Sequence, residues 1–465
     1  MKLLVPLLTL LLLIPSNSAL SQVAKNSPKY IAIELNSTYF TDQKRKIKIV
    51  LPDNYSQLKK YPVIYTLDGN SLFDLTSNYV AQLSKLTIEN NYDYATDVIP
   101  QSIVVGIYHN DRNYETTPNF SQYSGGDETI YTEGSEKLKK FLFEEVIPYV
   151  DANYTTSGYN SIIGHSNTAH FVMCLPFQEN NPFSGIVSLS LSGESKQFKK
   201  KIESFLSNNE KTSIFIGYGT KDFGFNEFAK QLEKEQYNHN LLVNRFDANH
   251  NEMPAISMVN AIKFLFKEYR NIEDFYNESL KNDFKIGDYL ELYSRKNKNF
   301  YGISTKLKED DFYSLIEMSI ISKNENALNQ LIEYNEKVNG YQTQTHMMFV
   351  YNKDIGSLEK AEFYARKMLN SKDDFENRIL NANLQLYYNF YAHDLKDIEK
   401  TIDFFEKGKT NFKKNKLEYS YFIAKASIES NTRKKLGKNS LDYCFKNYRH
   451  NRYFREDDLK KMAEK

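Results

Sequence analysis

The sequence contains no tryptophan, only two cysteines and almost no net charge. Its 60 Lys and Arg nearly balance its 59 Asp and Glu, so no overall field would attract nucleic acid or an anionic membrane. Cys174 and Cys444 lack a C-x-x-C spacing, and no H-E-x-x-H or similar histidine spacing occurs. We therefore expect no metal site. Cys174 lies in an apolar stretch that favours a buried free thiol, and a disulfide with Cys444 stays open.

Only one long apolar run is present, and it lies at the N-terminus. Residues 1–21 begin with one lysine near the start, continue with an apolar segment and end in small polar residues. This is the layout of a secretory signal peptide, and the run is short for a membrane span. We expect cleavage before Gln22, for which Ser16 and Ser18 offer an earlier alternative, and an exported protein, periplasmic or secreted, with no integral span after removal. An uncleaved N-terminal anchor is the alternative.

Residues 28–270 alternate strand-like and helical segments. The expected strands are short apolar runs at 46–51, 63–67, 103–107, 161–163, 185–190 and 213–217. Continuous apolar runs of this length are typical of strands buried on both faces of a parallel sheet. Amphipathic segments, such as 136–150, separate them. The pattern predicts an α/β sandwich with a mainly parallel sheet.

The strand signals disappear after residue 270, and residues 275–465 have a period near 3.6. Ala327 and Ala361 occupy equivalent places 34 residues apart, which is the period of the tetratricopeptide helix pair, and Thr401 takes the same place in a looser copy. A small residue there lets two helices approach closely. We expect an all-α domain of degenerate tetratricopeptide-like repeats, or alternatively an irregular helical bundle.

The segment I-I-G-H-S-N-T-A-H at 162–170 contains a candidate nucleophile. Gly164 and Ser166 match the first part of G-x-S-x-G, in which a serine lies on a strained turn between a buried strand and a helix. Thr168 stands where a second glycine is usual. A branched side chain there would either crowd the turn or reshape the acyl pocket, and we expect altered specificity rather than inactivity. The alternative is an ordinary serine at the end of a strand.

An acid and a histidine follow Ser166 in the order that a hydrolase triad requires. Asp222 comes just after the strand at 213–217, and His250 lies on a polar loop before an apolar helix. A histidine is suited to accept the serine proton and return it to the leaving group. Glu227 and Asp247 are alternative acids. We interpret His165 and His170 as packing residues and leave His109 without an assigned role.

Two backbone N–H groups are needed to stabilise an oxyanion. One is expected from Asn167, which follows the nucleophile. The second is expected from Asn70 or a neighbour, after the D-G bend at Gly69, which we also place at the substrate site. A simple β-turn is the alternative reading of this bend.

Five motifs, taken together, resemble the putative esterase family of α/β-hydrolases, which includes esterase D-like and enterochelin-type siderophore esterases. They are Y-P-V-I-Y-T-L-D-G-N-S-L-F, V-V-G-I-Y-H-N-D-R-N-Y-E-T-T-P, F-L-F-E-E-V-I-P-Y-V-D-A-N-Y, G-H-S, and N-H-N-E-M-P-A-I-S-M-V-N-A-I-K-F-L-F, between about residues 30 and 268. The resemblance implies Ser166 as nucleophile and His250 as base, while the acid varies within this branch. It places Arg112 near the substrate entrance, facing an anionic group or forming a structural ion pair.

The sequence therefore favours an exported serine esterase that forms an acyl-enzyme and needs no metal or organic cofactor. Its substrate would be a small carboxylic ester, such as a siderophore lactone or a polysaccharide-linked acetyl or feruloyl ester. The helical tail would contact a protein partner or mediate a dimer. The alternative is a non-catalytic interaction protein with a degenerate hydrolase domain and a partner-binding tail.

Overall fold

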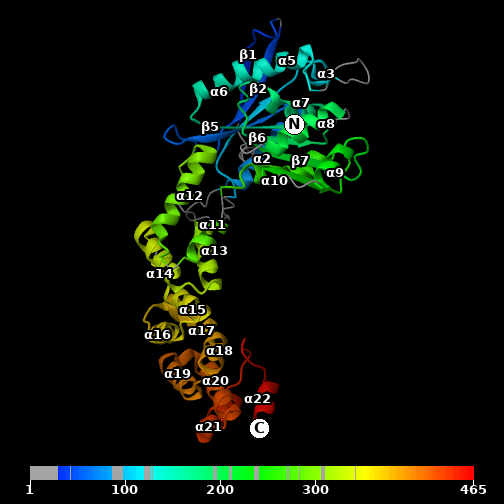
Figure 1. Cartoon of the computed structure of the whole chain (residues 1–465). Coiled ribbons are helices and arrows are strands. Elements are labelled where there is room, and N and C mark those ends of the chain that lie inside the picture. The colour runs from blue at the N-terminus through cyan, green and yellow to red at the C-terminus, as the bar shows by residue number, and fades with distance from the viewer. Residues whose placement is uncertain are drawn as a thin grey trace, which may run out of the picture. The chain divides into compact units, whose positions relative to one another are not determined.

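The structure, a computed structural model, describes the chain from residue 30 to 464 with gaps. The described residues are 30–41, 43–85, 98–119, 127, 129–191, 196–208, 212–234, 240–269, 272–281, 283–304, 309–340 and 342–464. The expected signal peptide at 1–21 lies outside them. Figure 1 shows the whole chain, in which strands occur in the first part and helices make up the rest.

The chain divides into two compact units. The first is Met1–Asn271 with Tyr293–Lys306, and the second is Ile272–Leu292 with Leu307–Lys465. The sequence predicts a boundary between 270 and 275, whereas in the structure part of helix α12 (Ile286–Tyr301) groups with the first unit.

An eight-stranded sheet forms the centre of the first unit over its described residues. Its order is β1-β2-β4-β3-β5-β6-β7-β8. The strands are β1 Tyr30–Asn36, β2 Lys44–Val50, β3 Tyr61–Thr66, β4 Ile103–Ile107, β5 Thr156–His165, β6 Gly185–Leu189, β7 Ser213–Gly219 and β8 Leu241–Phe246. Pairing is antiparallel between β1 and β2 and between β2 and β4, and parallel from β4 to β8. The expectation of a mainly parallel sheet is confirmed.

Both faces of the sheet are covered by helices. Every residue of β3, β4 and β6 is buried. Successive side chains of β3, such as Val63 and Ile64, enter two different apolar clusters because strand residues alternate between faces. One cluster receives side chains from α2 (Gly69–Leu83) and α10 (Met253–Leu265). The other receives them from α5 Glu133–Lys140, α6 Ile147–Asn153, α7 Asn167–Cys174, α8 Lys196–Asn208 and α9 Glu227–Lys234.

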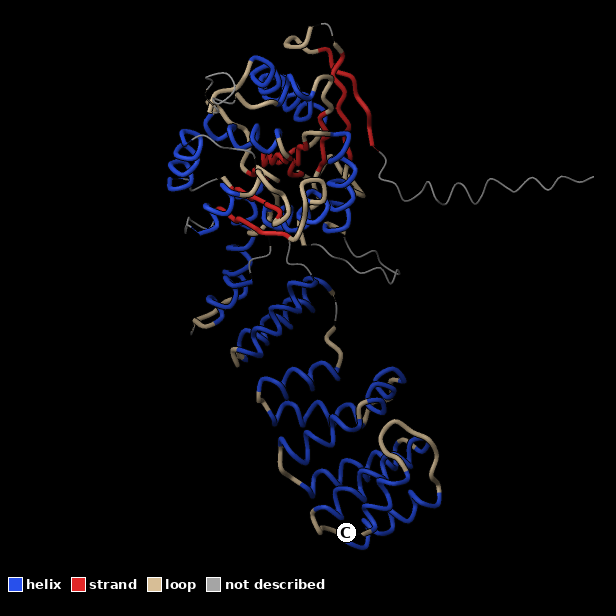
Figure 2. Tube along the Cα trace, turned by 90° about the vertical axis from the view of Figure 1, so that its right-hand side faces the viewer, coloured by secondary structure: helices blue, strands red, loops and turns tan. Residues whose placement is uncertain are grey.

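The second unit is helical throughout its described part, as Figure 2 shows. After α11 (Ile272–Ser279) and α12, its α-helices are α13 Glu309–Ile321, α14 Glu325–Tyr334, α15 Thr345–Ile355, α16 Leu358–Leu369, α17 Asp374–Ala382, α18 Leu384–Asn389, α19 Ile398–Asn411, α20 Lys416–Glu429, α21 Lys434–Lys446 and α22 Glu456–Ala463. The prediction of an all-α second part is confirmed. Ala327, Ala361 and Thr401 are fully buried on α14, α16 and α19. Their relation to tetratricopeptide repeats stays a prediction.

Neither cysteine crosslinks the chain. Cys174 lies in the first unit and Cys444 in the second, both buried, and no disulfide joins them. None of the helices in the described ranges combines the length and the apolar character needed to cross a membrane.

Close packing of α19 on α20 depends on a glycine. A Cβ built on Gly408 would overlap the ring of Tyr419, which is fully buried on α20. Because the ring is buried, it has no room to move aside. Only a residue without a Cβ therefore lets α19 approach α20 this closely. Helix propensity alone would favour alanine at this place by up to about 1 kcal/mol.

We predict that Gly408→Ala destabilises the helical unit by about 1–3 kcal/mol, since overpacking a core outweighs the gain in helix propensity. Denaturant unfolding followed by far-UV circular dichroism measures the change. Gly287→Ala is the matched control, because a Cβ on Gly287, in α12 of the same unit, would meet open space. Equal stability of the two variants would contradict this account of the α19–α20 contact.

Candidate active site

Ser166 lies on a strained turn between β5 and α7. Its φ of 63° and ψ of −121° are a backbone conformation that non-glycine residues rarely adopt. A Cβ on Gly164 would overlap the carbonyl oxygen of Thr168, so only glycine lets α7 begin so close to the strand. Strain of this kind persists where surrounding packing holds it, and it exposes a serine at the sheet edge in hydrolases.

Asp222 and His250 form a hydrogen-bonded pair at the same edge. Nδ1 of His250 lies 3.0 Å and 3.2 Å from the two carboxylate oxygens of Asp222. Asp222 is 2% exposed, and the His250 side chain is 30% exposed. Because the carboxylate accepts a hydrogen bond from Nδ1–H, a neutral His250 presents an unprotonated Nε2 as a base.

The two alternative acids point elsewhere. Asp247 and Glu227 are both 77% exposed and pair with Lys221 and Lys230, each at 2.9 Å. Of the three candidate acids, Asp222 is therefore the one in contact with His250.

Ser166, Asp222 and His250 follow the carboxyl ends of β5, β7 and β8, where groups from neighbouring parallel strands meet. His165 joins the serine turn to the histidine loop, since its Nε2 lies 2.9 Å from the carbonyl oxygen of His250. Burial, with a further contribution from nearby His250, lowers the pKa of His165 to about 4, so the neutral ring donates this hydrogen bond.

This position of His165 differs from the sequence interpretation, which gave it only a packing role. Its ring lies 4.6 Å from the ring of His250. His170, by contrast, is buried against Phe198 with ring centroids 4.5 Å apart, and burial lowers its pKa to about 3. Sequence spacing could not distinguish these two roles. Helix α7 begins between the two histidines, so that His165 ends β5 while His170 lies within the helix.

The expected oxyanion donors lie at two helix starts. Asn167 begins α7, and Asn70 lies in the first turn of α2, which follows β3, the neighbour of β5. Gly69 belongs to a helix start and not to an isolated turn, and a Cβ there would come within 2.7 Å of the Tyr108 ring. The backbone N–H groups of Asn70 and Asn167 have no hydrogen-bond partner within the described ranges.

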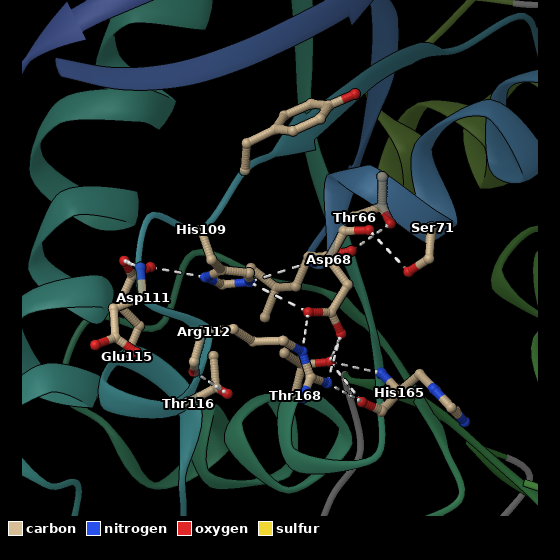
Figure 3. A network of polar contacts seen from close by, with 12 residues as sticks. Thr66, Asp68, Ser71, His109, Asp111, Arg112, Glu115, Thr116, His165 and Thr168 are labelled. Atoms are coloured by element: carbon tan, nitrogen blue, oxygen red, sulfur yellow. Dashed lines mark hydrogen bonds and ion pairs between the residues drawn. The ribbon is translucent and has the colours of Figure 1, made fainter. Parts of the chain in front are cut away.

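A buried carboxylate, Asp68, lies between these two helix starts, at the centre of the network in Figure 3. Its Oδ1 and Oδ2 accept hydrogen bonds from Nε and Nη2 of Arg112, at 2.6 Å and 3.0 Å. Its Oδ2 also lies 2.8 Å from Oγ1 of Thr168. Arg112 is thus engaged in an ion pair, which is one of the two roles that the sequence left open for it.

A second buried ion pair supports the first through His109. Glu115 is 1% exposed and accepts hydrogen bonds from both terminal nitrogens of Arg45, at 2.6 Å and 2.7 Å. It also contacts Nδ1 of His109 at 2.7 Å, while Nε2 of His109 accepts the N–H of Asp68 at 3.3 Å. Burial would raise the pKa of Glu115, but the hydrogen bonds from Arg45 and His109 outweigh burial and hold it at about 2.

Sequence reasoning assigned no role to Asp68, Glu115 or Arg45. The only available signal was the run H-N-D-R-N-Y-E, in which polar residues follow a buried strand. No part of the described chain brings together three or more His, Cys, Asp or Glu side chains that could hold a metal ion.

The order of the sheet, with helices on both faces, is that of the α/β-hydrolase fold, and the strained serine and the acid–histidine pair lie at one edge of this sheet. Residues 37–253 match the family described as Putative esterase. The match lies within the first unit of the chain.

Two curated relatives come from Bacillus subtilis (strain 168). Uncharacterized protein YjcH is 28% identical over 167 residues, 35% of this chain and 59% of its own length. Ferri-bacillibactin esterase BesA is 27% identical over 183 residues, 34% of this chain and 59% of its own length. The chain thus spans about three-fifths of each relative that it matches.

A solved structure shares the fold. The crystal structure of an uncharacterised protein from Capnocytophaga ochracea DSM 7271 aligns with a TM-score of 0.53 at 17% identity. The alignment covers 77% of this chain and 99% of that one, so it continues beyond the first unit into the helical unit.

The lowered pKa of Glu115 makes the free energy of unfolding depend on pH in the acidic range. Its pKa is 4.5 unfolded and about 2 folded, so its contribution, about 3 kcal/mol, is present above pH 4.5 and is lost as the pH falls toward 2. We predict that Glu115→Gln lowers the free energy of unfolding at pH 6, and that its difference from the wild type shrinks between pH 5 and pH 2. Denaturant titrations across this range measure it.

The exposed Glu133, which pairs with Lys137 on α5, provides the matched control. Glu133→Gln should follow the wild type at every pH. A constant difference between Glu115→Gln and the wild type would show that the buried carboxylate is not the titrating group.

Proposed function

We propose that the first unit is a serine esterase that hydrolyses a small carboxylic ester through an acyl-enzyme. The observation that carries this proposal is the Asp222–His250 pair at the sheet edge where the strained Ser166 lies. The match of residues 37–253 to the putative esterase family supports the same chemistry.

The proposed reaction has two stages, formation of an acyl-enzyme and its hydrolysis. His250 Nε2 takes the proton of Ser166 while Oγ attacks the ester carbonyl, and Asp222 holds the imidazole in the tautomer that this requires. The N–H groups of Asn167 and Asn70 stabilise the negative oxygen of the tetrahedral intermediate. His250 then donates the proton to the leaving alcohol, and a water activated by His250 releases the acid.

For the substrate we propose an ester that is met outside the cytoplasm. The apolar N-terminal run supports export. The relative BesA is named as an esterase of ferri-bacillibactin, which makes a siderophore ester one candidate here. A polysaccharide-linked acetyl or feruloyl ester is the other, and no metal or organic cofactor takes part in either reaction.

We predict that the protein without residues 1–21 hydrolyses p-nitrophenyl acetate and butyrate, and that Ser166→Ala and His250→Gln lose at least about 10³-fold in kcat. Asp222→Asn should lose about 10²–10⁴-fold, because the imidazole then takes the wrong tautomer. Asp247→Asn removes an exposed carboxylate and is the matched control. If Ser166→Ala retained wild-type rates, the esterase proposal would fail and the non-catalytic interaction protein would become the better account.

For the helical unit we propose that it docks an acidic peptide segment of a partner protein. A hollow of about 960 Å³ lies between α17, the α19–α20 connection and the segment before α22. Its cationic lining, which we call the basic hollow, consists of Arg378, Lys413, Lys414, Arg449 and Arg452. Residues 407–455 hold 14 Lys and Arg against three Asp and Glu, so the surrounding field also attracts anions.

The spread of the cationic lining favours an extended peptide over a simple anion. Its five side chains come from α17, from the α19–α20 connection and from the segment before α22. An extended acidic peptide supplies carboxylates at several points along its length to such a lining.

We predict that a fluorescein-labelled decapeptide of alternating Glu and Gly binds the protein, and that Lys413→Glu/Lys414→Glu weakens binding about tenfold or more. Fluorescence anisotropy at low and physiological salt measures it. Lys434→Glu/Lys435→Glu makes the same charge change on exposed residues of α21 outside the hollow, and should weaken binding far less. Equal losses would mean general electrostatic attraction without a docking site.

A further inference from the structure

Thr168 replaces the second glycine of the serine turn, and its side chain does not face an acyl pocket. It is fully buried in the first turn of α7. Oγ1 accepts the backbone N–H of His165 at 2.7 Å and lies 2.8 Å from both Asp68 Oδ2 and the carbonyl oxygen of His165. The reshaped pocket expected from the sequence is therefore not where this side chain points.

The hydroxyl has a single proton, and the surrounding groups decide where it goes. Arg112 Nη2 already donates to the carbonyl oxygen of His165 at 3.3 Å. A carboxylate is the stronger acceptor, because hydrogen bonds to an ionised group are about twice as strong as those between neutral groups. The Thr168 proton thus goes to Asp68, and the hydroxyl links the backbone of the serine turn to that carboxylate.

Asp68 in turn is fixed to the start of α2. Its backbone is left-handed, with φ 52° and ψ 49°. Its carbonyl oxygen accepts the N–H groups of Ser71 and Leu72, each at 2.9 Å, and its own N–H donates to His109. A shift of the carboxylate therefore moves the first turn of α2, which carries Asn70.

We propose that Thr168 is a positioning residue that sets the separation between the N–H groups of Asn167 and Asn70. The Thr168–Asp68 bridge joins the two helix starts that carry them. Because these donors act on the negative oxygen of the tetrahedral intermediate, the bridge affects the transition state and leaves ester binding nearly unchanged. This inference rests on the proposed function, since Ser166 must be the nucleophile.

Two substitutions separate the hydroxyl from the shape of the side chain. Thr168→Val keeps the branched shape and removes the hydroxyl, whereas Thr168→Ser keeps the hydroxyl and removes a methyl group. A packing role predicts that valine is tolerated at least as well as serine. The positioning role predicts the reverse.

The experiment measures kcat and KM for p-nitrophenyl butyrate and the inhibition constant of a trifluoromethyl ketone, which forms a tetrahedral adduct with a nucleophilic serine. For Thr168→Val we expect kcat to fall about 10–100-fold, KM to change less than about threefold, and the inhibition constant to rise in proportion to the loss in kcat. Thr168→Ser should restore most of all three values. Thermal unfolding of each variant confirms that it is folded, and Thr168→Ala takes the place of valine if that variant does not fold.

Two results would overturn the inference. The first leaves the esterase proposal standing, and the second overturns that proposal as well. If the wild type turns over the ester and Thr168→Val has wild-type kcat and inhibition, the positioning role fails while the esterase stands. If the wild type neither hydrolyses the ester nor binds the ketone more tightly than Ser166→Ala does, the proposed function fails and takes this inference with it.

Discussion

The buried Asp68 carboxylate is the interaction on which the candidate site depends. It accepts hydrogen bonds from the guanidinium of Arg112 and from the hydroxyl of Thr168. It lies between the end of β3 and the start of α2. An ionised group can be buried only if it is paired and hydrogen-bonded, so these contacts are a condition of the fold there. The same contacts bring the start of α2 against the start of α7. The contacts of Asp68 thus stabilise the fold at this edge of the sheet and also fix the positions of the two helix starts.

The strained serine turn has a comparable dependence on its neighbours. The φ of Ser166 is unfavourable, so the backbone on both sides must be held. Gly164 admits the close approach of Thr168, and the His165 ring attaches the turn to the loop that carries His250. Parallel strands β5, β7 and β8 bring these loops to one edge, although the residues are separated by up to 84 positions in the chain.

Much of the fold followed from local patterns in the sequence. Buried apolar runs such as 63–67 and 103–107 predicted central parallel strands, and the loss of strand signal after residue 270 predicted the helical part. Order along the chain and loop position were enough to nominate Ser166, Asp222 and His250. The Asp68–Arg112–Thr168 contacts were not predictable, because each pairs residues far apart in sequence. A carboxylate in a D-G bend and a threonine in place of glycine have ordinary local explanations.

The most direct test of the central claim is covalent labelling of the protein with a fluorophosphonate, followed by peptide mapping by mass spectrometry. The account predicts one adduct on Ser166, formed slowly in His250→Gln because the base that activates the serine is missing. Exposed serines elsewhere in the chain should stay unmodified. Labelling of a different serine, or no labelling of the folded wild type, would contradict the assignment of Ser166 as an activated nucleophile.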